Sequence, residues 1–167
     1  MKPSIKFRDA LQNDLAVIVS IYNSTIASRM VTADTIPVNV ESRQQWFDEH
    51  TADKHPLWIA EDEHTNIIGW LSFQKFYGRP AYDATAEISI YLHPVQRGKG
   101  YGKAILQYCI DNAPAFGVIN LLGYIFAHNI PSINLFLKMG FEEWANLKNI
   151  AILDGIERSV KILGKRL

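Results

Sequence analysis

The stretch "PVQRGKGYGKA" (residues 94–104) places three glycines and three basic residues between a proline and an apolar run. Before it, "ATAEISIYLHP" (84–94) alternates apolar and polar residues, which predicts a strand ending at Pro94. After it, apolar residues recur at helical spacing from Ile105. The first amides of a helix have no internal partner, and the helix dipole is positive at that end. We therefore predict that this loop binds a phosphate group.

Two familiar phosphate motifs do not fit the stretch. A Walker loop requires glycine at position 97 and serine or threonine at position 104, where this chain has Arg97 and Ala104. The dinucleotide motif requires glycine or alanine at position 103 or 105, where the chain has Lys103 and Ile105. The phosphate compound is therefore of another kind.

The remaining periodicities predict an α/β (α+β) fold with a mixed central sheet and helices on both faces. Pro131 suits the first turn of a short late helix and Gly140 suits its end. For the first helix we expect Asn13 or Asp14 as the N-cap. No linker interrupts the chain, so residues 1–167 are expected to form one domain. The predicted strands cover residues 4–10, 56–62, 67–76, 84–94, 119–127, 143–153 and 156–164, and the predicted helices lie near 13–23, 40–49, 101–113 and 131–139.

The composition narrows the possible partners. Seventeen basic residues balance seventeen acidic ones, so no overall field favours nucleic acid or an anionic membrane. The single cysteine, Cys109, rules out an internal disulfide and suits a reducing cytoplasm. We find neither a signal-peptide core nor a stretch approaching the roughly 20 apolar residues of a membrane helix. The histidines lack metal-ligand spacing, so no metal site is expected.

The motif that does fit is R-x-x-G-x-G, formed by Arg97, Gly100 and Gly102. With the preceding strand and the segment "HNIPSINLFLKMGF" (128–141), the chain resembles the GNAT acyltransferase superfamily over nearly its whole length. The resemblance implies that loop amides hold the pyrophosphate of acetyl-CoA and that Asn129 lies near the pantetheine arm. The cofactor-binding residues that it implies are Ile90, Tyr91, Leu92, Arg97, Gly98, Lys99, Gly100, Tyr101, Gly102, Lys103, Asn129 and Ser132.

The same resemblance assigns catalytic roles. Glu87, on the polar face of the strand before the loop, is the candidate base that removes a proton from the acceptor amine. The backbone amide of Leu92 is the candidate donor to the thioester oxygen. Many family members have a tyrosine acid in the late helix, but the matching residue is Phe136. Tyr124, another tyrosine or a water replaces it, or thiolate departure needs no acid. We expect direct transfer, because Cys109 lies on an apolar helix face.

A narrower resemblance concerns the acceptor. The stretch "FYGRPAYDATAEISIYLHP" (76–94) looks like the corresponding run of phosphinothricin and methionine sulfoximine acetyltransferases, which act on the α-amine of small glutamate-like compounds. Beside Glu87, the resemblance assigns Arg79 and Tyr82 to the substrate, and an arginine fork suits a carboxylate.

The opposite wall of the acceptor site is expected from the irregular residues 22–35. Possible contacts in that region are Asn23, Arg29 and Thr32. Related enzymes are homodimers, so we expect a homodimer here, with Trp46 or Trp144 either at the interface or in the core.

Two other hypotheses remain open. The enzyme could acetylate a polyamine, an aminoglycoside or a protein N-terminus. The first two would require a strongly acidic cleft, and the acidic run at residues 61–63 reads instead as a hairpin turn. The chain could also be a CoA-binding module without turnover, which Phe136 favours and Glu87 opposes.

Overall fold

A computed structural model describes residues 4–167 as one mixed sheet with helices on both faces. The strand order is β1-β2-β3-β4-β5-β7-β6, and only β4 and β5 run parallel. The predicted order of helices and strands is confirmed. The strands are β1 (Lys6–Asp9), β2 (Leu57–Glu61), β3 (Ile67–Lys75), β4 (Thr85–Leu92), β5 (Asn120–Phe126), β6 (Glu142–Leu153) and β7 (Ile156–Arg166), and the helices are α1 (Leu15–Asn23), α2 (Gln44–Asp48), α3 (Tyr101–Asn112) and α4 (Ile130–Lys138).

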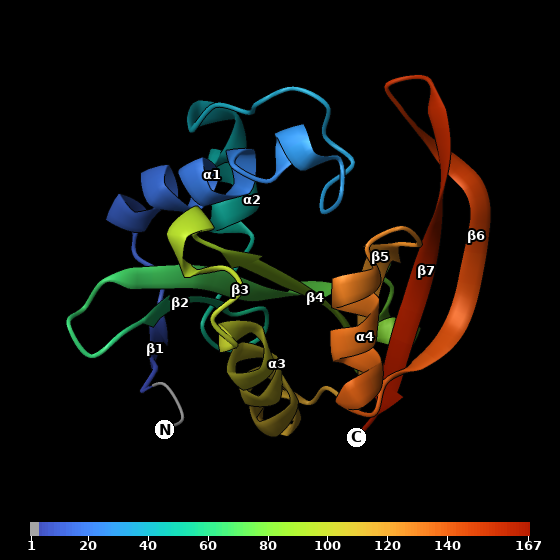
Figure 1. Cartoon of the computed structure of the whole chain (residues 1–167). Coiled ribbons are helices and arrows are strands. Elements are labelled where there is room, and N and C mark those ends of the chain that lie inside the picture. The colour runs from blue at the N-terminus through green and yellow to red at the C-terminus, as the bar shows by residue number, and fades with distance from the viewer. Residues whose placement is uncertain (1–3) are drawn as a thin grey trace.

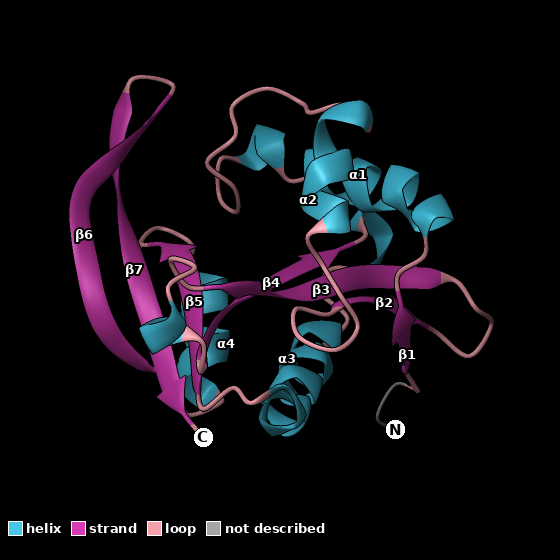
Figure 2. Ribbon diagram, turned by 180° about the vertical axis from the view of Figure 1, so that it is seen from behind, coloured by secondary structure: helices cyan, strands magenta, loops and turns pink. Residues whose placement is uncertain are grey.

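Each face of the sheet has its own apolar core. On one face, α3 and α4 bury Ile105 and Ile133 in the larger cluster. On the other, α1 buries Ile18 against Trp70 of β3, and Trp46 of α2 packs beside them. Figures 1 and 2 show the two helix pairs on opposite sides of the sheet. Trp46 therefore contributes to the core of the described chain, one of the two roles expected for it.

The start of α1 confirms one prediction only in part. The side chain of Asp14 does not cap this helix. It accepts hydrogen bonds from the Leu11 amide at 2.7 Å and from the Arg8 guanidinium at 2.7 and 3.0 Å, and a 3-10 turn (Gln12–Asp14) precedes the helix. Asn13 lies inside that turn. Asp14 thus occupies the N-cap position, as predicted, but forms no capping hydrogen bond because the guanidinium of Arg8, which also binds Glu61 of β2, takes its carboxylate.

The two edges of β4 are paired very differently. Its register with β3 is continuous from Ala86 to Leu92, whereas its register with β5 covers only Thr85 to Glu87. The His93 amide donates to Ile68 at 2.8 Å, and pairs alternate along an antiparallel ladder. The amides of Ile88, Ile90 and Leu92 therefore point away from β3, toward β5, where the ladder has ended. The sheet is split at this place (Figure 1).

A long hairpin formed by β6 and β7 completes the sheet. β7 pairs with both β5 and β6. The tip of the hairpin lies beside the irregular segment that follows α1 (Figure 1). Among residues 4–167, no helix is long and apolar enough to cross a membrane.

Candidate active site

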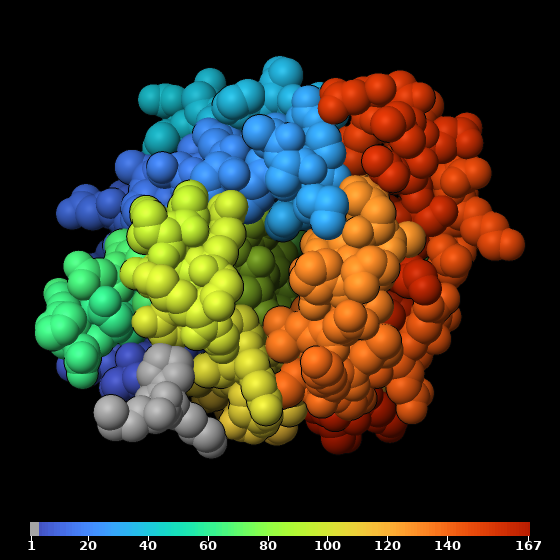
Figure 3. Space-filling model, in the orientation of Figure 1, coloured from blue at the N-terminus to red at the C-terminus, as the bar shows by residue number. Residues whose placement is uncertain are grey.

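The split between β4 and β5 opens into a cavity of about 450 Å³. Figure 3 shows the hollow between the yellow atoms around the start of α3 and the orange atoms of α4, with β4 at its floor. It is lined by Val31, Thr32, Ala33, Glu87, Ile88, Ser89, Ile90, Tyr91, Leu92, Gly102, Gly123, Tyr124, Ile125, Phe126, Asn129, Ser132, Leu135, Phe136 and Val160.

One end of the cavity is the glycine loop. Gly98 and Gly100 have φ of 75° and 84°, a conformation that favours glycine, and Gly100 is the N-cap of α3. A Cβ on Gly102 would lie 3.2 Å from Leu135 of α4, so the third glycine lets the two helices approach. The first amides of α3 thus open at the mouth of the split, as an anion site requires.

The basic residues of the loop lie at its exposed side. Arg97 donates from Nε to the Leu92 carbonyl at 3.2 Å and from Nη2 to Ser24 Oγ at 2.6 Å. Its guanidinium thus joins the end of β4 to the end of α1. Lys99 donates to Gln96 at 3.0 Å, and Lys103 is exposed on α3. The loop and the first turn of α3 therefore carry three exposed cations.

Glu87 lies at the last paired position of β4, where the split begins. Its side chain is on the α1 side of the sheet and lines the cavity. Burial raises the pKa of its carboxyl group, and within residues 4–167 it accepts no hydrogen bond and forms no ion pair. A carboxylate without a fixed partner and with an increased proton affinity suits a general base.

Tyr124 extends from β5 into the same cavity, two residues beyond the partner of Glu87. Burial raises the pKa of its hydroxyl, and the nearby charge of Glu87 adds to the shift. Phe136 of α4 also lines the cavity and is largely buried. A Cβ on Gly123 would lie 2.6 Å from its ring, so this glycine makes room for the ring. Among residues 4–167, Tyr124 and Tyr91 are therefore the two tyrosines that line the cavity near Glu87.

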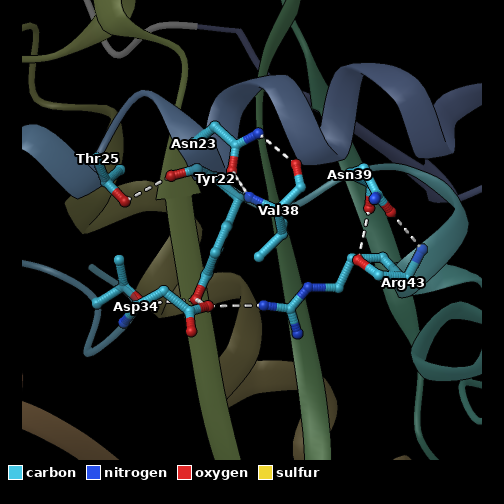
Figure 4. A network of polar contacts seen from close by, with 9 residues as sticks. Tyr22, Asn23, Thr25, Asp34, Val38, Asn39 and Arg43 are labelled. Atoms are coloured by element: carbon cyan, nitrogen blue, oxygen red, sulfur yellow. Dashed lines mark hydrogen bonds and ion pairs between the residues drawn. The ribbon is translucent and has the colours of Figure 1, made fainter. Parts of the chain in front are cut away.

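The wall opposite β4 is formed by residues 29–35, which we call the wall segment. The hydroxyl of Tyr22 donates to Asp34 and accepts a 2.5 Å hydrogen bond from the hydroxyl of Thr32. Arg43 binds Asp34 at 2.8 Å and lies over the Tyr22 ring, as Figure 4 shows in part. This network holds the wall segment against α1 and α2.

The three contacts expected from this region have different positions. Thr32 lines the cavity. Asn23 exchanges two hydrogen bonds with the backbone of Val38, at 2.8 and 2.9 Å (Figure 4). Arg29 turns to Asp154 at the tip of the hairpin, at 2.8 Å. Asn23 and Arg29 therefore support the wall and do not line the cavity.

The two residues expected to bind the acceptor lie outside the cavity lining. Arg79 precedes, and Tyr82 ends, an exposed 3-10 turn (Pro80–Tyr82) just before β4. The Tyr82 ring lies 5.4 and 6.3 Å from the rings of Phe76 and Tyr77, which form an exposed aromatic group with it. Their assignment to the substrate stays a prediction.

Other candidates have structural positions. Cys109 is fully buried in α3, and burial raises the pKa of its thiol, as a structural role requires. Trp144 is 46% exposed and covers Gly164. Within the acidic run, Glu61 is paired with Arg8, and Asp62 accepts amide hydrogen bonds that close the β2–β3 turn. Among residues 4–167, no group of three His, Cys, Asp or Glu side chains could hold a metal ion.

The sequence did not predict several residues of the cavity lining that come from distant segments of the chain. Val31, Ala33 and Val160 line the cavity although nothing in their local pattern marks them. The split itself had one available signal: Gly123 interrupts an apolar strand, and such a glycine often marks the close approach of another group.

A helix amide site at the mouth of a split parallel strand pair, with a carboxylate inside, suits an extended ligand with an anionic end. Residues 19–141 match the acetyltransferase (GNAT) family, and the chain belongs to this family. It is an acetyl-CoA-dependent N-acetyltransferase, as the resemblance implied.

Three relatives illustrate the match. YwnH of Bacillus subtilis (strain 168), provisionally named a phosphinothricin acetyltransferase, is 52% identical over 96% of this chain and 98% of the relative. The L-methionine sulfoximine/L-methionine sulfone acetyltransferase of Pseudomonas paraeruginosa is 33% identical over 83% of this chain and 81% of the relative. A phosphinothricin acetyltransferase from Sinorhizobium meliloti, solved with acetyl-CoA, superimposes with a TM-score of 0.90 at 29% identity, covering 98% of this chain and 88% of its own.

Proposed function

We propose that the protein transfers an acetyl group directly from acetyl-CoA to the α-amine of a small glutamate-like amino acid, of the phosphinothricin, methionine sulfoximine or methionine sulfone type. The observation that supports it is the position of Glu87, a half-buried carboxylate at the start of the split, on the strand that leads to the glycine loop, with no partner among residues 4–167. The names of the relatives support the class of acceptor.

The residues present fit acetyl-CoA. The loop amides and cations at residues 97–103 would hold the diphosphate. The pantetheine arm would lie between the split strands, where the unpaired backbone amides of β4 could bind it. The remaining cofactor-contact assignments, Asn129 and Ser132 included, stay predictions. When bound, acetyl-CoA supplies the activated acetyl group.

The chemistry of this chain's own residues follows. Glu87 takes the proton that the amine loses, directly or through water, because the ammonium form is unreactive. The amine nitrogen then bonds to the carbonyl carbon while the Leu92 amide donates to the carbonyl oxygen, and the second proton that this nitrogen loses goes to water. The carbon–sulfur bond breaks, and the thiolate takes a proton from Tyr124 or from water. Phe136 cannot supply it.

Acceptor recognition and assembly are part of the same proposal. Arg79 and Tyr82 would bind the carboxylate and polar head of the acceptor at the cavity entrance. A second copy of the chain would wall that entrance, and exposed apolar side chains of the β6–β7 hairpin, among them Trp144 and Ile152, support a homodimer. The cytoplasmic location expected from the sequence stays a prediction.

The test is a panel assay of thiol release from acetyl-CoA. Methionine sulfone, methionine sulfoximine and phosphinothricin should accelerate release, and spermidine, an aminoglycoside and an N-terminal peptide should not. The methyl ester of methionine sulfone is the matched control, since it keeps the amine and the sulfone but lacks the carboxylate; it should be a much poorer acceptor. If only another amine class reacts, the acceptor assignment is wrong. If none reacts while acetyl-CoA still binds, the proposed class of acceptor is wrong.

A further inference from the structure

The wall segment is fastened to the far side of the split by two adjacent residues between β5 and α4. The side-chain amide of Asn129 donates to the Met30 carbonyl at 3.0 Å. His128 Nε2 donates to the Arg29 carbonyl at 2.8 Å. These contacts join positions 99 residues apart in the sequence and bridge the two halves of the molecule across the cavity.

Asn129 has a second contact at its other end. Its Oδ1 accepts a hydrogen bond from the Ser132 amide at 3.3 Å and so caps α4. The side chain is 7% exposed and lines the cavity. One buried amide group therefore links the first turn of α4, on the side proposed for acetyl-CoA, to the wall segment, on the side proposed for the acceptor amine.

A third fastening holds the segment from outside. Arg29 binds Asp154 through two hydrogen bonds, at 2.8 and 3.1 Å, and also donates to the Thr35 carbonyl at 2.9 Å. Arg29 has a φ of 56°, which is unfavourable for a residue with a side chain, so these contacts must hold it. The other end of the segment is held by the Tyr22, Asp34 and Arg43 network.

Between its fastened ends, the segment presents residues 31–33 to the cavity. The shape of the acceptor side therefore depends on contacts that come from both halves of the protein. We propose that Asn129 is a positioning residue for the acceptor: its amide fixes the Met30 carbonyl and thereby sets the wall that Val31 and Thr32 form. This inference rests on the proposed function, because it assigns that wall to the acceptor amine.

The role differs measurably from the cofactor contact expected for Asn129. Asn129→Asp keeps the oxygen that caps α4 and replaces the donor to Met30 with a second acceptor. A negative charge at a helix N-terminus is tolerated, so α4 should stay folded. Asn129→Ser keeps a cap without charge but cannot reach Met30. In both variants the KM for the acceptor should rise about fivefold to tenfold, which is more than the Kd for acetyl-CoA rises.

Asp154→Asn tests the wall from outside the cavity. It weakens the pair with Arg29 on the exposed hairpin and should raise the acceptor KM in the same direction, about twofold to threefold. Glu143→Gln is the matched control: it removes the carboxylate that binds Lys161 at 2.6 Å on the same hairpin, away from the wall segment. It should leave the acceptor KM unchanged.

A readout without substrate keeps the inference separate from the proposed function. Hydrogen exchange of residues 30–35, followed by mass spectrometry, should be at least several times faster in Asn129→Asp and Asp154→Asn than in the wild type or Glu143→Gln. This result would support the fastening even if no amine in the panel reacts. Unchanged exchange, or a raised Kd for acetyl-CoA with an unchanged acceptor KM, would overturn it and leave Asn129 as a cofactor ligand.

Discussion

Asp14 and Glu87 are both carboxylates in largely buried positions, but the two regions that hold them have opposite effects. At the closed side of the sheet, Asp14 accepts two hydrogen bonds from Arg8, which lower the pKa of its carboxyl group. At the split, Glu87 has no such partner among residues 4–167, and burial raises the pKa of its carboxyl group. The partner, more than the burial, decides whether a carboxylate serves the fold or remains available for chemistry.

The backbone shows the same contrast. Along β3, strand β4 is paired from Ala86 to Leu92, and Tyr91 stacks on Trp70 with ring centroids 4.5 Å apart. Along β5, the pairing ends at Glu87. One strand therefore stabilises the sheet with one edge and lines the cavity with the other. Variants on either side should separate stability from catalysis.

The largest effect is expected for Glu87→Gln. Loss of a general base should lower kcat about a hundredfold or more near neutral pH. The Kd for acetyl-CoA should stay the same. In the wild type, kcat/KM should fall as the pH drops through the raised pKa of Glu87, because protonation removes the base. Assays of thiol release across a range of pH would measure the loss of kcat in the variant and the pH dependence of kcat/KM in the wild type. Glu63→Gln, in the exposed β2–β3 turn, is the control.

The stability of Glu87→Gln has a definite sign. Because its pKa is raised in the folded state, ionised Glu87 destabilises the fold as the pH rises. The variant should therefore be at least as stable as the wild type at pH 7, with the difference vanishing in acid. Unchanged turnover at every pH would remove Glu87 from the mechanism.

Asp14→Asn should produce the opposite pattern. The variant loses the ion pair with Arg8, and we expect the free energy of unfolding to decrease by about 2 kcal/mol at pH 7. The pKa of Asp14 is lowered in the folded state, so its stabilisation is present above the unfolded pKa of about 3.9 and is lost as the pH falls below it. Denaturant unfolding at pH 7 and near pH 3 should show the gap closing.

Activity provides the second half of this comparison. Asp14 does not line the cavity, so kcat/KM for acetyl transfer should stay near the wild-type value at a temperature where the variant is folded. A large kinetic loss without unfolding would contradict the separation of the two regions.

The sequence predicted what depends on neighbouring residues. The alternation in β4, the glycines of the loop and the helix boundaries at Pro131 and Gly140 are local patterns, and each is found in the structure. Gly140 has a φ of 82°, which its position after α4 requires. Local periodicity also placed Glu87 on the face opposite the apolar residues of β4.

The sequence could not predict what depends on distant contacts. The split between β4 and β5 begins beside the place where the Phe136 ring of α4 packs against Gly123. Asn129 matched a cofactor-binding motif, but its bond to Met30 depends on a loop 99 residues away. Asp14 is the N-cap residue of α1, but the capping hydrogen bond expected from its side chain is absent for the same reason, since Arg8 of β1 binds the carboxylate. A residue type is readable from sequence, but its partner often is not.

Substitutions of Arg97 should produce the smallest effect, because this residue is exposed and lies just beyond the end of β4, where the paired and the split edges meet. It holds the Leu92 carbonyl and Ser24 and also adds positive charge at the mouth of the cavity. Arg97→Gln should raise the KM for acetyl-CoA about threefold to fivefold at low salt, and less at high salt because exposed charges are screened.

Arg97→Lys distinguishes the charge from the clasp. Lysine keeps the positive charge but cannot bridge the Leu92 carbonyl and Ser24 with a planar fork. If charge attracts the diphosphate, the lysine variant should retain most of the affinity for acetyl-CoA, and Ser24→Ala should leave it unchanged. If instead Arg97→Lys and Ser24→Ala both lower kcat and leave the affinity for acetyl-CoA intact, the guanidinium acts by fixing the end of β4. Contacts that stabilise the fold would then also contribute to catalysis at the split.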